Sequence, residues 1–390
     1  MKKKVAVLGT GTAGVMNIAH YLLAFPEDWE ICSVHDPNNP ILGIGESTST
    51  QIPEILFDAT GFNLLEHAHE LDATVKFGVK FKGWRKKEFY SVINPKSNGI
   101  HFNNFRLKEF AFSKFKERWP NRFKEIHDHV IDITQKPEWI KIEGEYKSYA
   151  FDYVVDCRGY PTDYEDYDDA FINVNRCLVH TVNEPGNWDY TCHQATPDGW
   201  MFGIPLQTRQ GWGYLFNDNI TSVDEAKENM KVMLNTDNLD LREFKFNSYR
   251  AKKYIDGRLI KNGNRAIFYE PMEAHSGFFY DKIARTFVDY AQGYVDESTA
   301  NNILTRNAID MENAICFMYQ GGSNFNTEFW NWASKRSKEK LEKDVIWKQT
   351  LVELKEIQKE FPTGTISDGA GTYSLYHWMH FSKHLGYDYF

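Results

Sequence analysis

The chain has 390 residues, of which 42% are hydrophobic and 15% aromatic, so it can bury a large core and form two or three domains. Its 45 lysines and arginines against 54 aspartates and glutamates give a formal net charge of −9, which argues against a nucleic-acid-binding surface. No apolar run approaches the roughly 20 residues that span a bilayer, so we expect no membrane association.

The cysteine content points to a reducing compartment. The five cysteines form no Cys-x-x-Cys pair, and they are Cys32, Cys157, Cys177, Cys192 and Cys316. An odd, scattered set fits neither a disulfide framework nor a zinc cage, so a cytoplasmic protein is expected. The N-terminal Met-Lys-Lys-Lys precedes an apolar stretch, but glycines interrupt that stretch at once. We therefore interpret it as folded protein and not as a secretion signal.

The first 36 residues predict a dinucleotide-binding unit. A short β-branched strand at Val5–Leu8 leads into the glycine turn Gly9–Gly14, and a helical pattern follows from Val15 to Leu23. A second strand, Ile31–His35, ends at Asp36. In such a unit the glycines allow the backbone to approach a pyrophosphate, the helix N-terminus attracts it, and the acid binds ribose hydroxyls.

The later segments predict further strands and then helices. A strand at Ala150–Asp156, followed by Cys157-Arg158-Gly159, could close the dinucleotide sheet, although an ordinary buried strand and turn would look the same. Antiparallel strands are predicted at Cys177–Val182, Gly199–Leu206 and Gly211–Phe216. Helical periodicity then dominates at Asp281–Gln292, Asn302–Gln320, Lys338–Glu360 and Tyr373–His384.

Several separated motifs occur in a fixed order. They are Gly9-x-Gly11-x-x-Gly14, Gly43-Ile44-Gly45-Glu46-Ser47-Thr48 with Ile52-Pro53, Ala73–Phe81 closing at Trp84, Asp156-Cys157-Arg158-Gly159, Gly199–Leu206, Glu270-Pro271-Met272-Glu273 with Ser276-Gly277, and Phe329-Trp330. In this order they resemble the flavin-dependent halogenases of the tryptophan-halogenase family over most of residues 3–332. The chain is short for that family, which suggests a compact viral member.

The resemblance implies an α/β fold with an FAD-binding, Rossmann-like core of the flavin monooxygenase type. We expect residues 1–270 to form this FAD-binding module with an inserted antiparallel substrate-region sheet. Residues 271–390 are then a mainly helical region that completes the substrate site. The resemblance leaves the oligomeric state open.

The resemblance also implies a reaction. Such enzymes use reduced FAD, supplied by a separate flavin reductase, with O2 and a halide ion to make hypohalous acid, which halogenates an electron-rich aromatic small molecule. The family's catalytic lysine and glutamate correspond to Lys76 and Glu273. An ammonium can polarise hypohalous acid or, when neutral, capture its halogen as a haloamine, and a carboxylate can remove the ring proton. Lys80, on the same face of the predicted strand, and Glu270 remain alternatives.

The other site residues implied by the resemblance form three groups. The FAD-binding residues are Gly9, Gly11, Thr12, Ala13, Gly14, Asp36, Gly45, Glu46, Ser47, Thr48 and Asp156. Ser276 and Gly277 match the family's halide-binding turn. Trp200, Phe202, Ile204 and Pro205 match the Trp-x-Trp-x-Ile-Pro wall that keeps substrate from the flavin, with phenylalanine replacing the second tryptophan. Two ordinary core aromatics are the alternative for Trp200 and Phe202.

Two departures from the family pattern have consequences. Ala274-His275 places one extra residue before Ser276, which could widen the halide site and favour bromide or iodide. The run Asn264–Tyr269 also lacks the family's Gly-x-Ala-x-x-Phe stretch before Glu270-Pro271, so FAD binding could be weak.

Two alternative functions and one alternative site stay open on the sequence. A flavin-dependent monooxygenase would hydroxylate an aromatic substrate directly, and a catalytically silent relative would only bind flavin. His377, His380 and His384 share a helical face, but without nearby cysteines or carboxylates we expect aromatic packing and no metal site.

Overall fold

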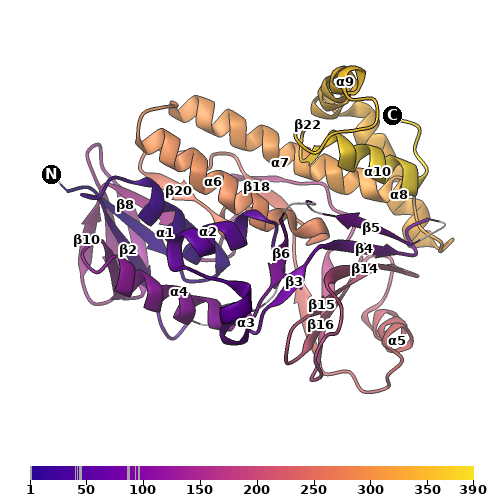
Figure 1. Cartoon of the computed structure of the whole chain (residues 1–390), viewed down its shortest axis with the longest axis horizontal. Helices are drawn as coiled ribbons and strands as arrows, with labels where there is room; N and C mark the ends of the chain where they lie inside the picture. Colours follow the sequence, from indigo (N-terminus) through magenta and orange to yellow (C-terminus); the bar gives the residue numbers. More distant parts are fainter. Residues whose placement is uncertain are drawn as a thin grey trace. The chain divides into compact units, whose positions relative to one another are not determined.

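The computed structural model describes residues 2–39, 41, 43, 46–85, 88–92, 94 and 97–390. The described backbone divides into two units, each built from segments that alternate along the chain (Figure 1). Unit 1 comprises Met1–Thr74, Gly99–Asp169 and Tyr249–Thr305, and unit 2 comprises Val75–Asn98, Ala170–Ser248 and Arg306–Phe390. This division differs from the expected boundary at residue 270, because the antiparallel sheet groups with the C-terminal helices and not with the dinucleotide sheet.

Unit 1 is built on a six-stranded sheet in the order β19-β20-β11-β1-β2-β7. Its strands are β1 (Lys4–Leu8), β2 (Glu30–His35), β7 (Phe123–His127), β11 (Tyr153–Asp156), β19 (Ile255–Asp256) and β20 (Leu259–Lys261). All neighbouring pairs are parallel except β19 with β20. The prediction that the strand before Cys157 closes the dinucleotide sheet is confirmed, because β11 pairs with β1.

Unit 1 also contains, among its described residues, two three-stranded sheets and six α-helices. The sheets are β10-β9-β8 and β12-β18-β21, from β8 (Val130–Gln135), β9 (Ile140–Gly144), β10 (Ser148–Phe151), β12 (Tyr167–Asp169), β18 (Tyr249–Ala251) and β21 (Ile267–Phe268). The helices are α1 (Thr12–Ala24), α2 (Gln51–Thr60), α3 (Leu64–Leu71), α4 (Asn104–Arg118), α6 (His275–Ala291) and the N-terminal part of α7 (Glu297–Tyr319). Helix α1 packs against α2, α4 and α6.

Unit 2 contains a seven-stranded sheet in the order β17-β13-β16-β15-β14-β4-β5. Its strands are β4 (Gly78–Lys82), β5 (Phe89–Val92), β13 (Arg176–Val182), β14 (Tyr190–Thr196), β15 (Gly199–Pro205), β16 (Gln210–Phe216) and β17 (Leu241–Lys245). The three predicted antiparallel strands are therefore confirmed within about one residue at each end. Side chains of β13, β15 and β16 form a core with α5 (Val223–Leu234), through Ala226 and Met230.

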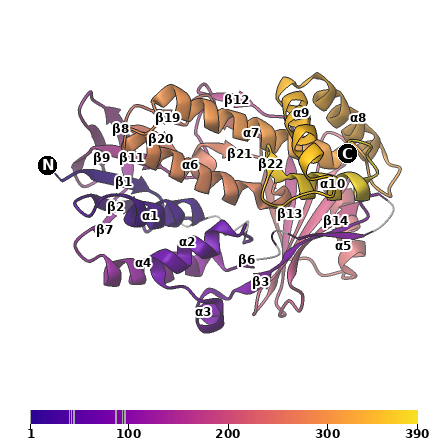
Figure 2. The ribbon, with the colours of Figure 1, turned by 45° about the horizontal axis from the view of Figure 1, so that its top comes forward.

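The C-terminal helices are α8 (Glu328–Lys343), α9 (Val345–Glu360) and α10 (Leu375–Leu385), with the short pair β22 (Gly369–Ala370) and β23 (Tyr373–Ser374) before α10. Figure 2 shows these helices gathered together, in orange and yellow. One long helix was predicted over Lys338–Glu360, but the chain breaks at Asp344, whose side chain accepts from the backbone N–H of Trp347 at 2.8 Å and so begins α9.

The chain crosses from one unit to the other at five places, two of which fall within β3 (Thr74–Lys76) and α7. Strand β6 (Gly99–His101) begins the second segment of unit 1. Among the described helices, none is both long and apolar enough to cross a membrane.

A buried acid on α7 predicts how stability depends on pH. Asp310 is 6% exposed, accepts from the Thr350 hydroxyl at 3.1 Å, and has its carboxylate 3.7 Å from Arg306. Burial raises the pKa of Asp310 to about 6. Folding therefore favours the protonated acid, and this contribution is complete below pH 4 and lost as the pH rises through 6. Asp310→Asn should raise the free energy of unfolding by about 2 kcal/mol at pH 8 and leave it nearly unchanged at pH 4.

Urea denaturation at the two pH values measures this difference. Glu353→Gln is the matched control, since Glu353 is half-exposed and pairs with the same Arg306. It should change stability by less than about 1 kcal/mol at either pH. An Asp310→Asn effect of the same size at pH 4 and pH 8 would contradict the prediction.

Candidate cofactor site and catalytic residues

At two glycines of the turn between β1 and α1, a side chain would clash with the backbone. Gly9 has φ +93°, and a Cβ added there would lie 2.9 Å from the Cys157 carbonyl oxygen. A Cβ on Gly14 would lie 2.1 Å from the Gly9 carbonyl oxygen. Both distances are shorter than real contacts allow, so the turn requires glycine at both positions. This tight turn between strand and helix is the backbone geometry that the predicted dinucleotide turn requires.

The start of α1 offers an anion-binding end. Gly11 is the N-cap residue, no side chain caps the helix, and its first turn, which includes Thr12 and Ala13, carries no acid. The first N–H groups of a helix have no intrahelical partner, and the helix dipole places partial positive charge there. A phosphate group would accept hydrogen bonds from these N–H groups and would be attracted by the positive end of the helix dipole.

Asp36 follows β2 directly and remains an acceptor for ribose hydroxyls. Its Oδ1 accepts from the backbone N–H of Asn38 at 2.8 Å, and its Oδ2 lies 3.2 Å from His129 Nδ1. The Asn38 N–H, helped by His129, lowers the pKa of Asp36. An ionised carboxylate has about four acceptor positions, so two contacts leave capacity for a ribose.

The second predicted flavin loop lies against β6 and α4. Gly45, and Ile44 before it, fall outside the described residues. Glu46 is buried and accepts from the backbone N–H of Asn104 at 3.3 Å, while Thr48 exchanges backbone and hydroxyl hydrogen bonds with Ile100. Ser47 forms a β-bridge with His101.

Asn104 connects this loop to the glycine turn, because its Oδ1 accepts from the Thr12 hydroxyl at 2.8 Å. Asn104 could not be selected from the sequence, since the contact depends on two loops meeting in space. His101 was missed in the same way: it is fully buried on β6, with Nδ1 3.1 Å from the Thr74 hydroxyl oxygen.

Asp156 ends β11 next to the glycine turn. It is 5% exposed and accepts from Arg158 at Nε and Nη2, both 2.9 Å, and at the backbone N–H, 3.1 Å. Burial alone would raise the pKa of Asp156, but the Arg158 guanidinium holds it below its usual value. The Asp156 side chain is therefore an ion-pair partner of Arg158, and a direct contact with FAD stays a prediction.

Gly263 lies one residue before the run Asn264–Tyr269, the run in which the sequence lacks the family's glycine motif. Gly263 follows β20, has φ +64°, and begins the 3₁₀ turn η1 (Gly263–Arg265). A Cβ on Gly263 would lie 2.8 Å from the Ala13 side chain. A third backbone segment thus closes on the glycine turn, and weak FAD binding stays a prediction.

The segment around Glu273 is held in an unusual backbone conformation. Glu273 (φ 56°, ψ 14°) and Ala274 (φ 57°, ψ 31°) are both left-handed, within and at the end of the short turn η2 (Met272–Ala274). Each such residue costs about 1–2 kcal/mol. Glu273 is partly buried and Glu270 almost fully buried.

The predicted halide-binding residues begin α6. Helix α6 starts at His275, directly after Ala274, without a side-chain cap and without an acid in its first turn. Ser276 and Gly277 lie in this first turn, where backbone N–H groups lack intrahelical partners. Two left-handed residues, Glu273 and Ala274, thus stand directly before this helix start, and its role in halide binding stays a prediction.

The structure separates the two candidate lysines. They do not share one continuous strand, because β3 ends at Lys76 and β4 begins at Gly78. Lys80 Nζ lies 3.0 Å from Glu88 and near the rings of Tyr90 and Tyr190, and the bond to Glu88 raises its pKa. Lys76 is 1% exposed. Lys80 thus has a sufficient structural role, whereas a fully buried lysine is rare and needs a reason.

The predicted wall residues lie on β15, and Trp200, Phe202, Ile204 and Pro205 are all buried. Trp200 has its ring centroid 4.7 Å from His193 and 6.3 Å from Trp84, and the Phe202 centroid is 6.4 Å from it. Gly213 opposite Phe202 leaves the space for its ring. The bulky pair exists as predicted, within an aromatic cluster of unit 2. Its role as a wall stays a prediction.

The C-terminal histidines bind a sheet edge. His377 Nε2 lies 2.9 Å from the Val92 carbonyl and His380 Nε2 lies 2.6 Å from the Tyr90 carbonyl, on edge strand β5. His384 stacks on Phe89. These contacts occupy the outward carbonyls of an edge strand, which would otherwise template pairing with another chain.

A different group offers metal-ligand atoms, with His35, Glu125 and His127 within 4.8 Å of one another. Lys116 and Lys108 also lie 2.6 and 3.3 Å from the same carboxylate. Two ammonium groups so close would repel a metal ion, and we interpret the group as an ion-pair cluster.

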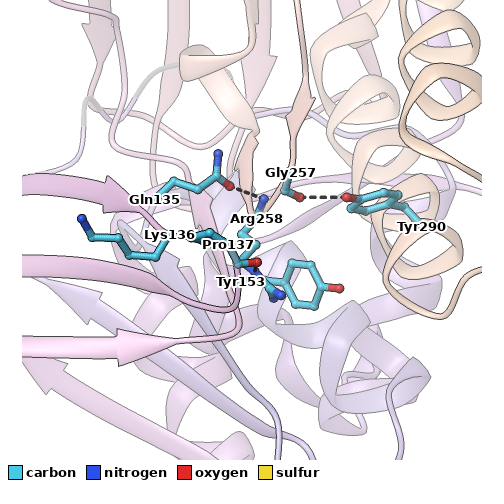
Figure 3. A pocket seen from close by; sticks show the side chains of 7 residues that line it. All are labelled: Gln135, Lys136, Pro137, Tyr153, Gly257, Arg258 and Tyr290. Carbon is cyan, nitrogen blue, oxygen red and sulfur yellow. Dashed lines mark hydrogen bonds between the residues drawn. The ribbon is translucent and has the colours of Figure 1, made fainter.

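A surface recess of about 480 Å³ lies elsewhere in unit 1 (Figure 3). Tyr153 begins β11 and Arg258 precedes β20, so the recess is at the amino ends of these strands, whereas the glycine turn follows the carboxyl end of β1. Arg258 is already bonded to the carbonyls of Pro137 and Asp152. Nucleotides bind at the carboxyl ends of parallel strands, so this recess is not the predicted cofactor site.

A parallel sheet, a glycine turn at its carboxyl edge and an acid after the second strand together define a dinucleotide-binding protein. The family model described as tryptophan halogenase matches residues 4–138 and 124–361. The chain therefore belongs to the tryptophan halogenase family, which confirms the resemblance seen in the sequence. A viral origin stays a prediction.

Relatives and solved structures agree with this assignment. A tryptophan 7-halogenase of Kutzneria sp. (strain 744) is 21% identical over 71% of this chain and 67% of its own length. One from Lentzea aerocolonigenes is 22% identical with the same coverage. The structure of a tryptophan halogenase from Shewanella frigidimarina superposes with a TM-score of 0.80 at 15% identity, over 99% of this chain and 89% of that one. At this identity the last likeness shows the fold alone.

The Gly263 contact can be tested by adding one methyl group. Gly263→Ala should destabilise the protein by about 2–4 kcal/mol and weaken FAD binding, because a left-handed alanine would also press on Ala13. Gly61→Ala is the matched control, since Gly61 has φ +74° and no atom within 4 Å of an added Cβ. It should cost only about 1–2 kcal/mol and leave FAD binding unchanged. Urea denaturation and flavin fluorescence titration measure the two effects, and equal losses in both variants would count against the contact.

Proposed function

We propose that this flavin-dependent halogenase uses reduced FAD, O2 and a halide ion to halogenate an electron-rich aromatic small molecule, with Lys76 and Glu273 as its catalytic residues. Membership of the tryptophan halogenase family is the observation that carries the proposal. Reduced FAD would come from a separate flavin reductase, because the first 36 residues supply the one dinucleotide unit that the motifs indicate.

The residues around the glycine turn fit FAD. Gly9, Gly14 and Gly263 let three backbone segments approach one another closely at the start of α1, because a Cβ at any of them would clash with protein atoms, and the uncapped start of α1 attracts a diphosphate. Asp36 would bind the ribose. Bound FAD would supply the two-electron chemistry with O2 that oxidises halide to hypohalous acid.

The chain's own residues would then control the hypohalous acid. The ammonium of Lys76 would donate a hydrogen bond to it and make its halogen more electrophilic. The carbon–halogen bond forms at the aromatic ring as the halogen–oxygen bond breaks. Glu273 would accept the ring proton that leaves, and the released hydroxide takes up a proton to become water. The N–H groups at the start of α6, at Ser276 and Gly277, would bind the halide ion before its oxidation.

Direct hydroxylation is the second candidate, favoured by the smaller Phe202 in place of a tryptophan. It needs no halide. The mass of the product formed from indoles and phenols, with and without bromide, separates the two activities.

Removal of either catalytic group should abolish most halogenation. Lys76→Ala and Glu273→Gln should each lower the rate about 100-fold or more, the usual size of a general acid–base contribution, with FAD affinity unchanged. The double variant should be no slower than the slower single one if the two side chains act as a unit. Lys80→Ala and Glu270→Gln are the matched controls. Mass spectrometry of the halogenated product gives the rates, and a Lys76→Ala enzyme of wild-type rate would overturn the assignment.

The extra residue before Ser276 should favour a large halide. With chloride, bromide and iodide at equal concentration, we expect brominated or iodinated product to exceed chlorinated product. Deletion of Ala274 should shift the product ratio towards chloride. Ala274→Gly keeps the length and removes a left-handed alanine, so it should keep the halide preference and stabilise the protein by about 1 kcal/mol. A clear chloride preference in the wild type would end this hypothesis.

A further inference from the structure

Two arginines lie beside one carboxylate at the edge of the glycine turn. The inference drawn from them rests on the proposed function, since its ligand is FAD. Arg158 saturates Asp156, with Nε and Nη2 each 2.9 Å from one carboxylate oxygen and the backbone N–H 3.1 Å from Oδ1. This is the two-pronged geometry in which a guanidinium pairs most strongly with a carboxylate. Asp156 thus has a complete partner in Arg158 alone.

Arg265 is a second cation at the same place. Its Nε lies 3.4 Å from Asp156 Oδ2, and its side chain is 15% exposed. This Nε–H is buried and makes no hydrogen bond in the described structure. Two guanidiniums against one carboxylate leave one positive charge in excess. A buried donor and a partly buried surplus charge are both costly without an anionic partner.

The neighbouring acid does not balance this charge. Asp166 is exposed, and its carboxylate lies 3.6 Å from the ammonium of Lys261, so it already has a cationic partner. Lys261 Nζ lies 4.7 Å from the Tyr167 ring centroid. Among the described residues, Asp156 is the one carboxylate within 4.0 Å of the Arg265 guanidinium, and it is shared with Arg158.

The turn that carries Arg265 is fixed against the glycine turn. Gly263 packs on Ala13, and the fully buried Asn262 donates to Asn17 of α1 at 3.0 Å. Two backbone carbonyls of this turn accept hydrogen bonds from tyrosine hydroxyls. Tyr249 donates to the Asn264 carbonyl at 2.5 Å, and Tyr167 donates to the Arg265 carbonyl at 2.7 Å. On the other side, the Arg158 Cα lies 3.5 Å from where a Gly9 Cβ would be.

The turn that carries Arg265 thus packs against α1, whose N-terminus is uncapped and has no acid in its first turn. We propose that Arg265 binds the diphosphate of FAD, as a second anchor beside the glycine turn. A diphosphate carries two negative charges, which match one surplus guanidinium and the helix end together. The same contact would make the protein prefer FAD to flavins without the second phosphate and the adenosine.

Binding measurements without turnover test this role. The wild type and Arg265→Gln are titrated with FAD, ADP and riboflavin by calorimetry and flavin fluorescence. The dissociation constants for FAD and ADP should rise about tenfold or more in Arg265→Gln, while that for riboflavin stays within about twofold. The affinity of the variant for ADP should also depend less on salt, since one charge contact is lost. Arg265→Lys keeps a point charge, so its dissociation constants for FAD and ADP should lie between those of the wild type and those of Arg265→Gln.

Arg285→Gln is the control for loss of an arginine from an ion pair of unit 1, because Arg285 pairs with Asp281 on α6. Its affinities should equal those of the wild type. If Arg265 only balances Asp156, Arg265→Gln will lower thermal stability and leave the affinities for FAD and ADP unchanged, which overturns the inference. A wild-type protein that binds neither FAD nor ADP would overturn both the inference and the proposed function. FAD binding that is indifferent to Arg265 would overturn the inference alone.

Discussion

The organisation of unit 1 depends on a close approach of three backbones that leaves no space for a Cβ. The turn after β1 carries Gly9 and Gly14, the end of β11 presses a carbonyl against Gly9, and the turn after β20 presses Gly263 against Ala13. Each contact joins segments far apart in sequence. Because these contacts lie at the carboxyl edge of a parallel sheet, they bring the ends of β1, β11 and β20 together. The helix dipole, Asp156 and its two arginines therefore share one small region.

The dinucleotide unit could be predicted because its signal is local. Strand, glycine turn, helix and acid all fall within 36 residues, and each has a distinct sequence pattern. The division into units could not be predicted, since it depends on which distant segments pack together. The single strand expected over Ala150–Asp156 shows the same limit. Its two halves join different sheets, because Asp152 bonds to Lys4 through both backbone and side chain, and periodicity carries no trace of that contact.

The candidate site divides in the same way. The family resemblance selected Lys76 and left Lys80 as the alternative, because alternation along a predicted strand places both on one face and cannot show that the strand is interrupted. Glu88, Tyr90 and Tyr190 surround the Lys80 ammonium in three dimensions and give that lysine a structural role, while the catalytic role of Lys76 stays a prediction. Gly263 was overlooked because its spacing from Glu270 did not match the expected motif, although the backbone it provides does. His377 and His380 shared a helical face as predicted, but the atoms they bind are carbonyls of a strand nearly 300 residues earlier.

The backbone at Glu273 and Ala274 gives a physical reason to expect function there. Two consecutive left-handed residues that are not glycine cost a few kcal/mol together, and glycine at either position would remove part of that cost. Such a conformation persists when the surrounding structure requires it, here between the Glu270-Pro271 corner and the first turn of α6. An alternative chain path would be easier to form, but it would move the Glu273 carboxylate relative to the N–H groups of Ser276 and Gly277. The strain therefore fixes the position of Glu273, the proposed base, relative to the start of α6.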